Sequence, residues 1–371
     1  MRICKSKKIV RVFGLALLAV SFLALFSSCQ DVIYWNIRNE VTLASANVKA
    51  DIRSIVRFKD EFYCANGTIY RKSNTINKRG TWSKTSAPRT GQVLKLASDT
   101  TYLYALVGVS KEDYGEGENV PVRRELYYST DGSTWSKVTG VYGNGDVPYN
   151  SSGRIEAYLF GTNAIAPANR KAYFVLKGGK AGYKAYSLNG ANAAEEALGT
   201  ENGGTKPVCN KDKVSQSCVY CAGSVHFFNS TGSCTNETTA GGDETMYYYG
   251  DGSTLRYGGA KSGSVGAHAS ITSIACTKNF LLVGTSSGYT HHPLTAGVPG
   301  GRDTNLPYNA AATLSGQYTI LAILVVNPEN NETDTAIYAS QNYTGNGSNS
   351  AQFDHICMWA YYPSEREWNR D

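Results

Sequence analysis

The residues most able to do chemistry in this sequence are its cysteines. Two residues separate Cys218 from Cys221, and this C-x-x-C spacing occurs in many metal-binding and redox-active pairs. A tetrahedral zinc site would need a second such pair, and the sequence has none. The pattern therefore favours disulfides or buried thiols and predicts no metal. Seven cysteines follow Cys29, an odd number that leaves at least one without a partner in the chain: Cys64, Cys209, Cys218, Cys221, Cys234, Cys276 and Cys357.

Histidines and acids form no clearer catalytic pattern. His291 and His292 are adjacent, and adjacent residues of a strand point to opposite faces, so they do not form a pair of metal ligands. Asp131 and Asp251 are candidate acids, but each precedes a glycine in a turn that explains its carboxylate as a turn-stabilising group. We therefore expect no catalytic residue and no cofactor, and a protein that is not an enzyme.

The first 28 residues have the organisation of an export signal. Residues 2–11 contain five basic residues and no acid, and the apolar run 12–26 follows. That run is shorter than the ~20 residues of a membrane-spanning helix. Loss of the signal lowers the formal net charge from +6 to +1, so the remaining chain lacks the basic balance expected of a nucleic-acid-binding domain.

The junction that follows predicts lipidation. Ser27 and Ser28 directly precede Cys29 and resemble the lipobox of bacterial lipoproteins, with Phe26 replacing the usual aliphatic residue, as in the looser lipoboxes of spirochaetes. The resemblance implies that Cys29 becomes the first residue, carries acyl chains such as palmitate, and anchors the protein to a bacterial membrane, which we expect to be the outer membrane. Ordinary secretion with an incidental cysteine is the alternative.

One polar turn lies between two β-rich runs. Residues 126–128 lead into Ser129, Asp131 and Gly132, and Trp135 opens the returning strand of a predicted hairpin. Asp131 can accept hydrogen bonds within the turn, and Gly132 supplies a positive φ. Trp135 then carries a large apolar area toward a seam between packed sheets. A single hairpin cannot bury Trp135, so we expect neighbouring copies.

Partial copies of this pattern indicate a repeat. Residues 81–84 match residues 134–137, and Asp251 and Gly252 follow a tyrosine-rich run. A period of roughly 50 residues built from short strands is typical of a β-propeller blade. The turn also resembles the Asp-box of sialidase-like and related bacterial propellers, although it is one residue shorter than the commonest form.

We therefore predict an all-β protein in three parts. Residues 1–28 are a lipoprotein signal peptide, and residues 29–50 are a lipidated tether that contains a closing strand, at 32–35 or 41–43. Residues 51–371 form a β-propeller of six four-stranded blades, with seven as the alternative. Blade strands are expected at 54–58, 61–65, 68–71, near Trp82, at 93–96, 101–107, 126–128, near Trp135, and later at 172–176, 225–228, 280–283 and 320–326.

Three long polar insertions are candidate binding loops: 111–120, 229–244 and 343–352. We expect each to join the second and third strands of a blade, which places all three on one face, opposite the turn that contains Asp131. Loops on a rigid ring commonly carry binding, and unselected surface sequence is the alternative. The candidate binding residues are Lys111, Glu112, Tyr114, Glu116 and Tyr343, together with Gly345 and the neighbouring Asn346.

The lipobox and the body rich in Tyr, Gly and Asn together are similar to treponemal surface lipoproteins, some of which attach to host fibronectin. This resemblance implies an adhesin for a host extracellular-matrix protein such as fibronectin, with a protein or glycan as its ligand. One alternative is a sialidase-like, glycan-active propeller enzyme, although the FRIP-type arginine motif is absent. Another is a scaffold subunit of an envelope assembly complex.

Overall fold

The structure is a computed structural model of the chain. Cys29 and the predicted signal peptide and closing strands lie outside the described residues, as do most of the predicted binding loops. The structure describes residues 46–371 except 50, 74–78, 90–91, 111–120, 149–155, 162–169, 179–181, 198–216, 222–223, 229–230, 238–243, 260, 268, 303–317, 328, 331–333 and 344–355.

The described residues form antiparallel strands grouped in consecutive sheets, here called blades 1 to 7. Blade 1 contains β1 (Ser54–Phe58), β2 (Glu61–Ala65), β3 (Ile69–Ser73) and β4 (Ser83–Thr85). Blade 2 contains β5 (Gln92–Ser98), β6 (Leu103–Ser110), β7 (Pro121–Ser129), β8 (Ser136–Lys137) and β9 (Asp146–Pro148), with the short 3-10 helix η2 (Tyr142–Gly145) before β9. Blade 3 contains β10 (Glu156–Gly161), β11 (Ala172–Gly178), β12 (Gly182–Asn189) and β13 (Asn192–Glu196).

The second half of the chain continues this arrangement with one exception. Blade 4 is a two-stranded sheet of β14 (Ser217–Cys221) and β15 (Ser224–Phe228). Blade 5 contains β16 (Thr231–Glu237), β17 (Glu244–Asp251), β18 (Thr254–Gly259) and β19 (Gly263–Ala267). Blade 6 contains β20 (Ile271–Cys276), β21 (Phe280–Thr285), β22 (Gly288–Thr295) and β23 (Val298–Pro299). Blade 7 contains β24 (Tyr318–Val325), β25 (Ile337–Tyr343), β26 (Met358–Tyr362) and β27 (Glu367–Arg370).

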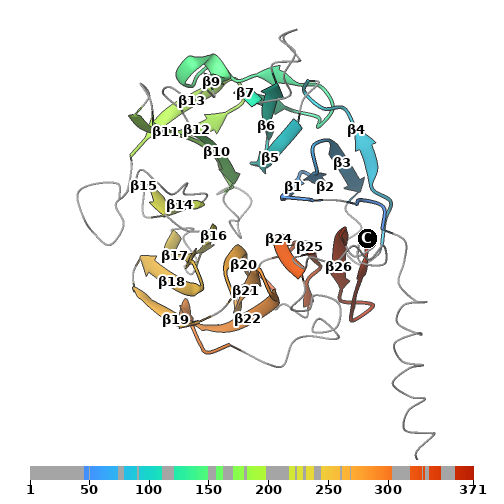
Figure 1. The fold of residues 1–371 in the computed structure, drawn as a ribbon, viewed down its shortest axis with the longest axis vertical. Coiled ribbons are helices and arrows are strands. Elements are labelled where there is room, and N and C mark those ends of the chain that lie inside the picture. The colour runs from blue at the N-terminus through green and yellow to red at the C-terminus, as the bar shows by residue number, and fades with distance from the viewer. Residues whose placement is uncertain are drawn as a thin grey trace, which may run out of the picture. The chain divides into compact units, whose positions relative to one another are not determined.

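The first strands of the blades form a closed ring. Each lies against the first strand of the next blade, in the order β1, β5, β10, β14, β16, β20 and β24, and β24 lies against β1. Figure 1 shows these strands nearest the centre, with the later strands of each blade farther out. The prediction of an all-β propeller with six four-stranded blades is therefore confirmed, with β9 as an additional strand paired to β7 of blade 2. The two-stranded blade 4 occupies a seventh position in the ring.

One predicted loop is wrong. The segment 229–244 was expected to be a loop between a second and a third strand, but it contains β16, the first strand of blade 5. β16 is rich in Thr and Ser and pairs with β17 through two register shifts. A polar, irregular strand of this kind lacks the alternation of apolar residues by which a strand is recognised in sequence.

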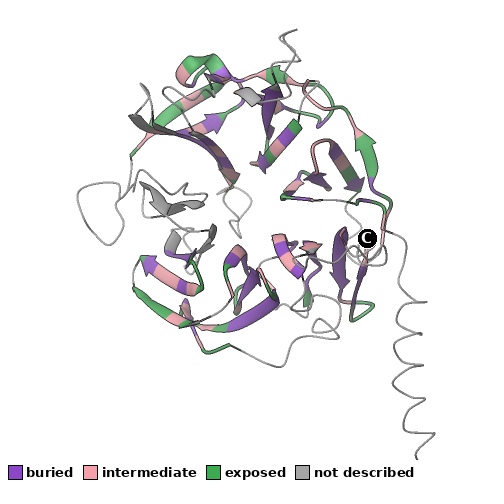
Figure 2. Cartoon of the chain, in the orientation of Figure 1, coloured by how far each residue is buried: buried purple, intermediate pink, exposed green. Residues whose placement is uncertain are grey.

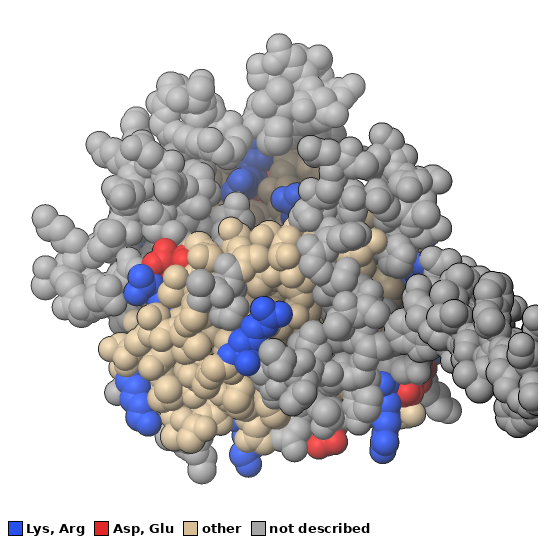
Figure 3. All heavy atoms as spheres, turned by 60° about the horizontal axis from the view of Figure 1, so that its bottom comes forward, with Lys and Arg blue, Asp and Glu red and all other residues tan. Residues whose placement is uncertain are grey.

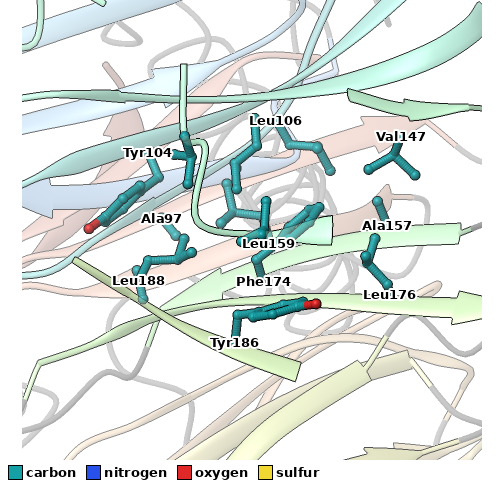
Figure 4. Close-up of a cluster of buried hydrophobic side chains, with 14 residues drawn as sticks. Ala97, Tyr104, Leu106, Val147, Ala157, Leu159, Phe174, Leu176, Tyr186 and Leu188 are labelled. Carbon is teal, nitrogen blue, oxygen red and sulfur yellow. The ribbon is translucent and has the colours of Figure 1, made fainter. Parts of the chain in front are cut away.

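The described core lies in seams between adjacent blades, and Figure 2 shows buried residues on the strands of the blades that form these seams. Burial on both faces explains why strands such as β26, whose five residues are all buried, are apolar or aromatic without alternation. Between blades 2 and 3, Tyr104 and Leu106 of β6 pack in one cluster with Phe174 and Leu176 of β11 (Figure 4). Similar clusters lie between blades 1 and 2, 5 and 6, and 7 and 1.

Small hydroxyl side chains tie neighbouring first strands together. The Ser54 hydroxyl donates to the backbone oxygen of Leu96 at 3.1 Å and accepts from its N–H at 2.9 Å. The Ser98 hydroxyl donates to the backbone oxygen of Arg57 at 2.6 Å, and Ser273 of β20 donates to Ile320 of β24 at 3.0 Å. These bonds fix the register between blades and therefore the positions of side chains at the centre of the ring.

The described residues before β1 contact the last blade. Lys49 forms a β-bridge with Cys357, and the N–H of Met358 donates to the backbone oxygen of Val48 at 3.1 Å. All four strands of blade 7 come from the C-terminal part of the chain, so residues 47–49 add contacts to a blade that is already complete. No helix in the described part of the chain is long and apolar enough to cross a bilayer.

Candidate functional site

Two of the predicted binding loops connect strand ends on one face. β6 ends at Ser110 and β7 begins at Pro121, whereas β25 ends at Tyr343 and β26 begins at Met358. Because neighbouring strands are antiparallel, all four ends lie on the face at which the first strand of each blade begins, here called the loop face. Tyr343 pairs with Tyr318 through the backbone, at the end of β25. The other candidate binding residues lie outside the described part of the chain: Lys111, Glu112, Tyr114, Glu116, Gly345 and Asn346.

The Asp131 turn lies on the opposite face, here called the turn face. The carboxylate of Asp131 accepts from the N–H groups of Thr134 at 2.7 Å and Ser133 at 2.8 Å. The Ser129 hydroxyl donates to Asp131 at 3.0 Å and accepts from the N–H of Gly132 at 2.8 Å. The bonds from the N–H groups of Thr134 and Ser133 hold the pKa of Asp131 well below its usual range. This carboxylate therefore stays ionised and serves the turn.

The turn also joins blade 2 to blade 1. The Lys59 ammonium donates to the backbone oxygen of Thr130 at 2.6 Å, and the Trp135 indole N–H donates to Ser86 at 3.0 Å. Trp135 packs against the apolar cluster between the two blades. Gly132, with a φ of 73°, lies against the ring of Tyr63. These contacts assign the turn to packing between blades.

A charged cluster that the sequence did not suggest is centred on β7 of blade 2, with further members on β8 and in the segment between β4 and β5. Glu125 is buried, and its carboxylate lies 3.0 Å from both Arg89 and Arg123 and 3.6 Å from Lys137. Tyr127 donates a hydrogen bond to it at 2.6 Å. Burial opposes ionisation of Glu125, but this bond and the three cations outweigh it and leave the pKa of Glu125 below its ordinary value. The cluster has the character of a structural ion network.

The centre of the ring carries a second group of cations. The first strands present Arg57 on β1 and Lys95 on β5, and Arg53 lies immediately before β1. The Lys95 ammonium donates to the backbone oxygen of Arg53 at 3.2 Å, which places both residues near the loop face. Arg57 lies farther along β1 and donates to the backbone oxygen of Val326 at 3.4 Å. Figure 3 shows a hollow in the molecule with lysine or arginine side chains inside it.

The cysteines and histidines form no metal site in the described part of the chain. Cys64 is a buried free thiol, Cys276 is disulfide-bonded, and the side chains of Cys218 and Cys221 are outside the described set. His291 and His292 are both buried, and His292 Nδ1 lies 2.9 Å from the backbone oxygen of Gly300. No three described His, Cys, Asp or Glu side chains are grouped closely enough to hold a metal ion.

Comparison with known proteins finds similarity in structure only. No family model matches the sequence, and no curated protein matches it. A solved structure of YCF48 bound to D1 peptide is 11% identical, with a TM-score of 0.44 over 81% of this chain and 93% of that one. The WD40 β-propeller domain of Doa1 is 10% identical, with a TM-score of 0.36 over 80% and 91% of the two chains. At this distance the assignment of the fold rests on the strand order and the closed ring described above.

Proposed function

We propose that this protein is a lipid-anchored binding protein of a bacterial surface, and specifically an adhesin for a host extracellular-matrix protein such as fibronectin. The acyl chains on Cys29 hold it to the outer membrane, and the loop face carries the ligand. The observation that carries the proposal is that the strand ends flanking 111–120 and 344–355 lie together on one face of a closed ring. A rigid ring that presents several long connections on one face is suited to binding a macromolecule.

Replacement of the loops tests this proposal. In the full-length protein, residues 111–120 and 344–352 are each exchanged for a Gly/Ser linker of equal length, and binding to immobilised fibronectin is measured. The matched control exchanges residues 74–78, which join β3 to β4 on the turn face. We expect both loop-face variants to lose binding and the control to keep it. Unchanged fibronectin binding in both loop-face variants would show that these loops do not bind fibronectin.

Two further measurements test the other parts of the proposal. Cys29→Ser should abolish acylation, detected as the loss of the acyl mass on the N-terminal peptide, and should release the protein from the membrane fraction. Acylation at another residue would contradict the proposed anchor. A panel of fluorogenic glycosides, including sialosides, should show no turnover by the purified protein. Turnover of any of them would favour the sialidase-like alternative.

A further inference from the structure

Arg57 and Lys95 lie on the first strands of blades 1 and 2, and no carboxylate of the described residues forms an ion pair with either of them. One amino group of the half-buried Arg57 reaches Val326, whereas its buried Nε has no hydrogen-bond partner. Lys95 donates to the backbone oxygen of Arg53. Among the described residues, neither side chain forms an ion pair, in contrast to Arg89, Arg123 and Lys137 around Glu125. Both cations therefore donate only to neutral backbone oxygens among the described residues.

Lys95 is exposed to solvent on a first strand that other first strands flank. Its side chain is exposed, yet desolvation by the surrounding protein lowers the pKa of its ammonium. Both the exposure and the lowered pKa are explained if the Lys95 side chain lies in an opening at the centre of the ring. Such an opening admits water at one end, and the first strands surround it on its other sides. A cation in such a place attracts an anion more strongly than one on a flat surface.

The register between β1 and β5 sets the spacing of the two cations. The Ser98 hydroxyl bonds to the backbone oxygen of Arg57, and the Lys95 ammonium bonds to that of Arg53. Arg57 is therefore level with Ser98, three residues farther along β5 than Lys95. At ~3.3 Å per residue the two positions are roughly 10 Å apart along the ring axis. An extended peptide covers that span in about three residues.

We propose that the centre of the ring binds an acidic peptide segment that enters from the loop face, with one carboxylate at Lys95 and a second at Arg57. The inference rests on the proposed binding function and names the chemistry of its partner. A peptide fits better than a free inorganic anion because the first strands also carry half-buried apolar side chains, including Leu321 and Ile323 of β24. These can pack against the aliphatic stems of glutamates. The planar guanidinium of Arg57 suits a bidentate carboxylate.

Fluorescein-labelled hexaglutamate serves as the probe in an anisotropy titration of the full-length protein in detergent at low salt. Hexaglutamine of equal length reports on binding that does not need charge, and citrate reports on small anions. Lys95→Gln and Arg57→Gln remove the two cations separately, so a folding defect in one variant leaves the other informative. Lys84→Gln is the matched control, because Lys84 is an exposed lysine on β4, the outermost strand of blade 1.

We expect hexaglutamate to bind in preference to hexaglutamine, and each single substitution to weaken that binding by about tenfold, the loss of one charge-assisted contact. Lys84→Gln should leave the affinity within about twofold. Equal binding of the two peptides, or unchanged affinity in a folded Lys95→Gln protein, would overturn the proposal. Citrate binding as tight as that of hexaglutamate would overturn the extended peptide as occupant. Fibronectin binding is measured separately, so loss of the loop-dependent interaction and loss of this one are distinguishable.

Discussion

The ammonium of Lys72 lies 2.5 Å from the carboxylate of Asp371, and both side chains are only 1% exposed. Lys72 belongs to β3 of blade 1, and Asp371 follows β27 of blade 7, so the pair joins the two blades at which the ring closes. The Trp82 indole N–H donates to the same carboxylate at 2.8 Å, and the Tyr362 hydroxyl donates to its other oxygen at 3.1 Å. The ammonium also lies 5.1–5.7 Å from the ring centroids of Trp82, Tyr338 and Tyr362. Ring closure therefore depends on a fully enclosed ion pair.

Asp371→Asn should destabilise the protein strongly. The substitution leaves the Lys72 ammonium buried without a counter-charge, which costs about 3–5 kcal/mol in comparable buried pairs. Urea denaturation followed by tryptophan fluorescence gives the change in the free energy of unfolding. Lys72→Met in the same background should restore part of the loss, because it removes the unpaired charge. Asp251→Asn breaks an exposed pair with Arg256 and should change stability by no more than ~1 kcal/mol. Equal effects of the two Asp→Asn changes would contradict the role given to the Lys72–Asp371 pair.

Ionisation of Glu125 should make the free energy of unfolding depend on pH under acidic conditions. Its folded pKa lies below the ordinary value of 4.5, so the unfolded chain binds the proton more readily. The stabilisation is therefore complete above pH ~4.5 and is lost as the pH falls through the folded pKa. Glu125→Gln should lower the free energy of unfolding at neutral pH by about 1–3 kcal/mol, since Arg89 and Arg123 lose a buried counter-charge, whereas Lys137 keeps its ion pair with Asp146. The difference in the free energy of unfolding between Glu125→Gln and the unmodified protein should become smaller as the pH falls.

Denaturation at a series of pH values checks the prediction for Glu125. Glu195→Gln is the control, because Glu195 pairs with Lys184 at an exposed site on β13. It should change stability by no more than ~1 kcal/mol. A constant difference between Glu125→Gln and the unmodified protein down to low pH would show that Glu125 is not the titrating group.

Alanine substitutions at Gly132 and Gly252 distinguish the cost of backbone strain from the cost of steric overlap. Both have positive φ, 73° and 60°, so an alanine at either site incurs a conformational cost of about 1 kcal/mol. A Cβ on Gly132 would overlap the hydroxyl oxygen of Tyr63 and lie 2.6 Å from its ring, whereas a Cβ on Gly252 meets nothing within 4 Å. Tyr63 is 1% exposed and cannot move away freely.

Gly132→Ala should therefore cost about 1–3 kcal/mol more than Gly252→Ala in chemical denaturation, because overpacking adds to the strain. A Gly132→Ala, Tyr63→Phe double variant keeps most of the ring and should recover only part of the loss. Equal costs at the two glycines would show that the seam between blades 1 and 2 can open to admit a methyl group.

The parts of this fold that could be predicted from sequence are those with local signals. The turn at 129–135 is indicated by Asp131 and Gly132, and the strands of blades 1 and 2 are short apolar runs between turns. β16 was missed because its residues are polar and its pairing is irregular. The Lys72–Asp371 pair was missed because 299 positions separate its members, and nothing near either residue points to the other. Likewise, the exposure of Lys95 at the centre of the ring depends on closure of the whole ring.

Cys64 offers a readout of that closure. Burial raises the pKa of its thiol well above the ordinary value, and the negative charge of Asp371 raises it further, against the opposing effect of Lys72. Since the thiolate is the reactive form, Cys64 should resist iodoacetamide in the native protein at mildly alkaline pH and react in concentrated guanidinium, as measured by peptide mass spectrometry. In Asp371→Asn the labelling of Cys64 should speed up, because loosening of the seam between blades 7 and 1 admits the reagent. If Cys64 in the native protein reacts as fast as a solvent-exposed thiol, the seam between blades 7 and 1 is open even with the Lys72–Asp371 ion pair in place.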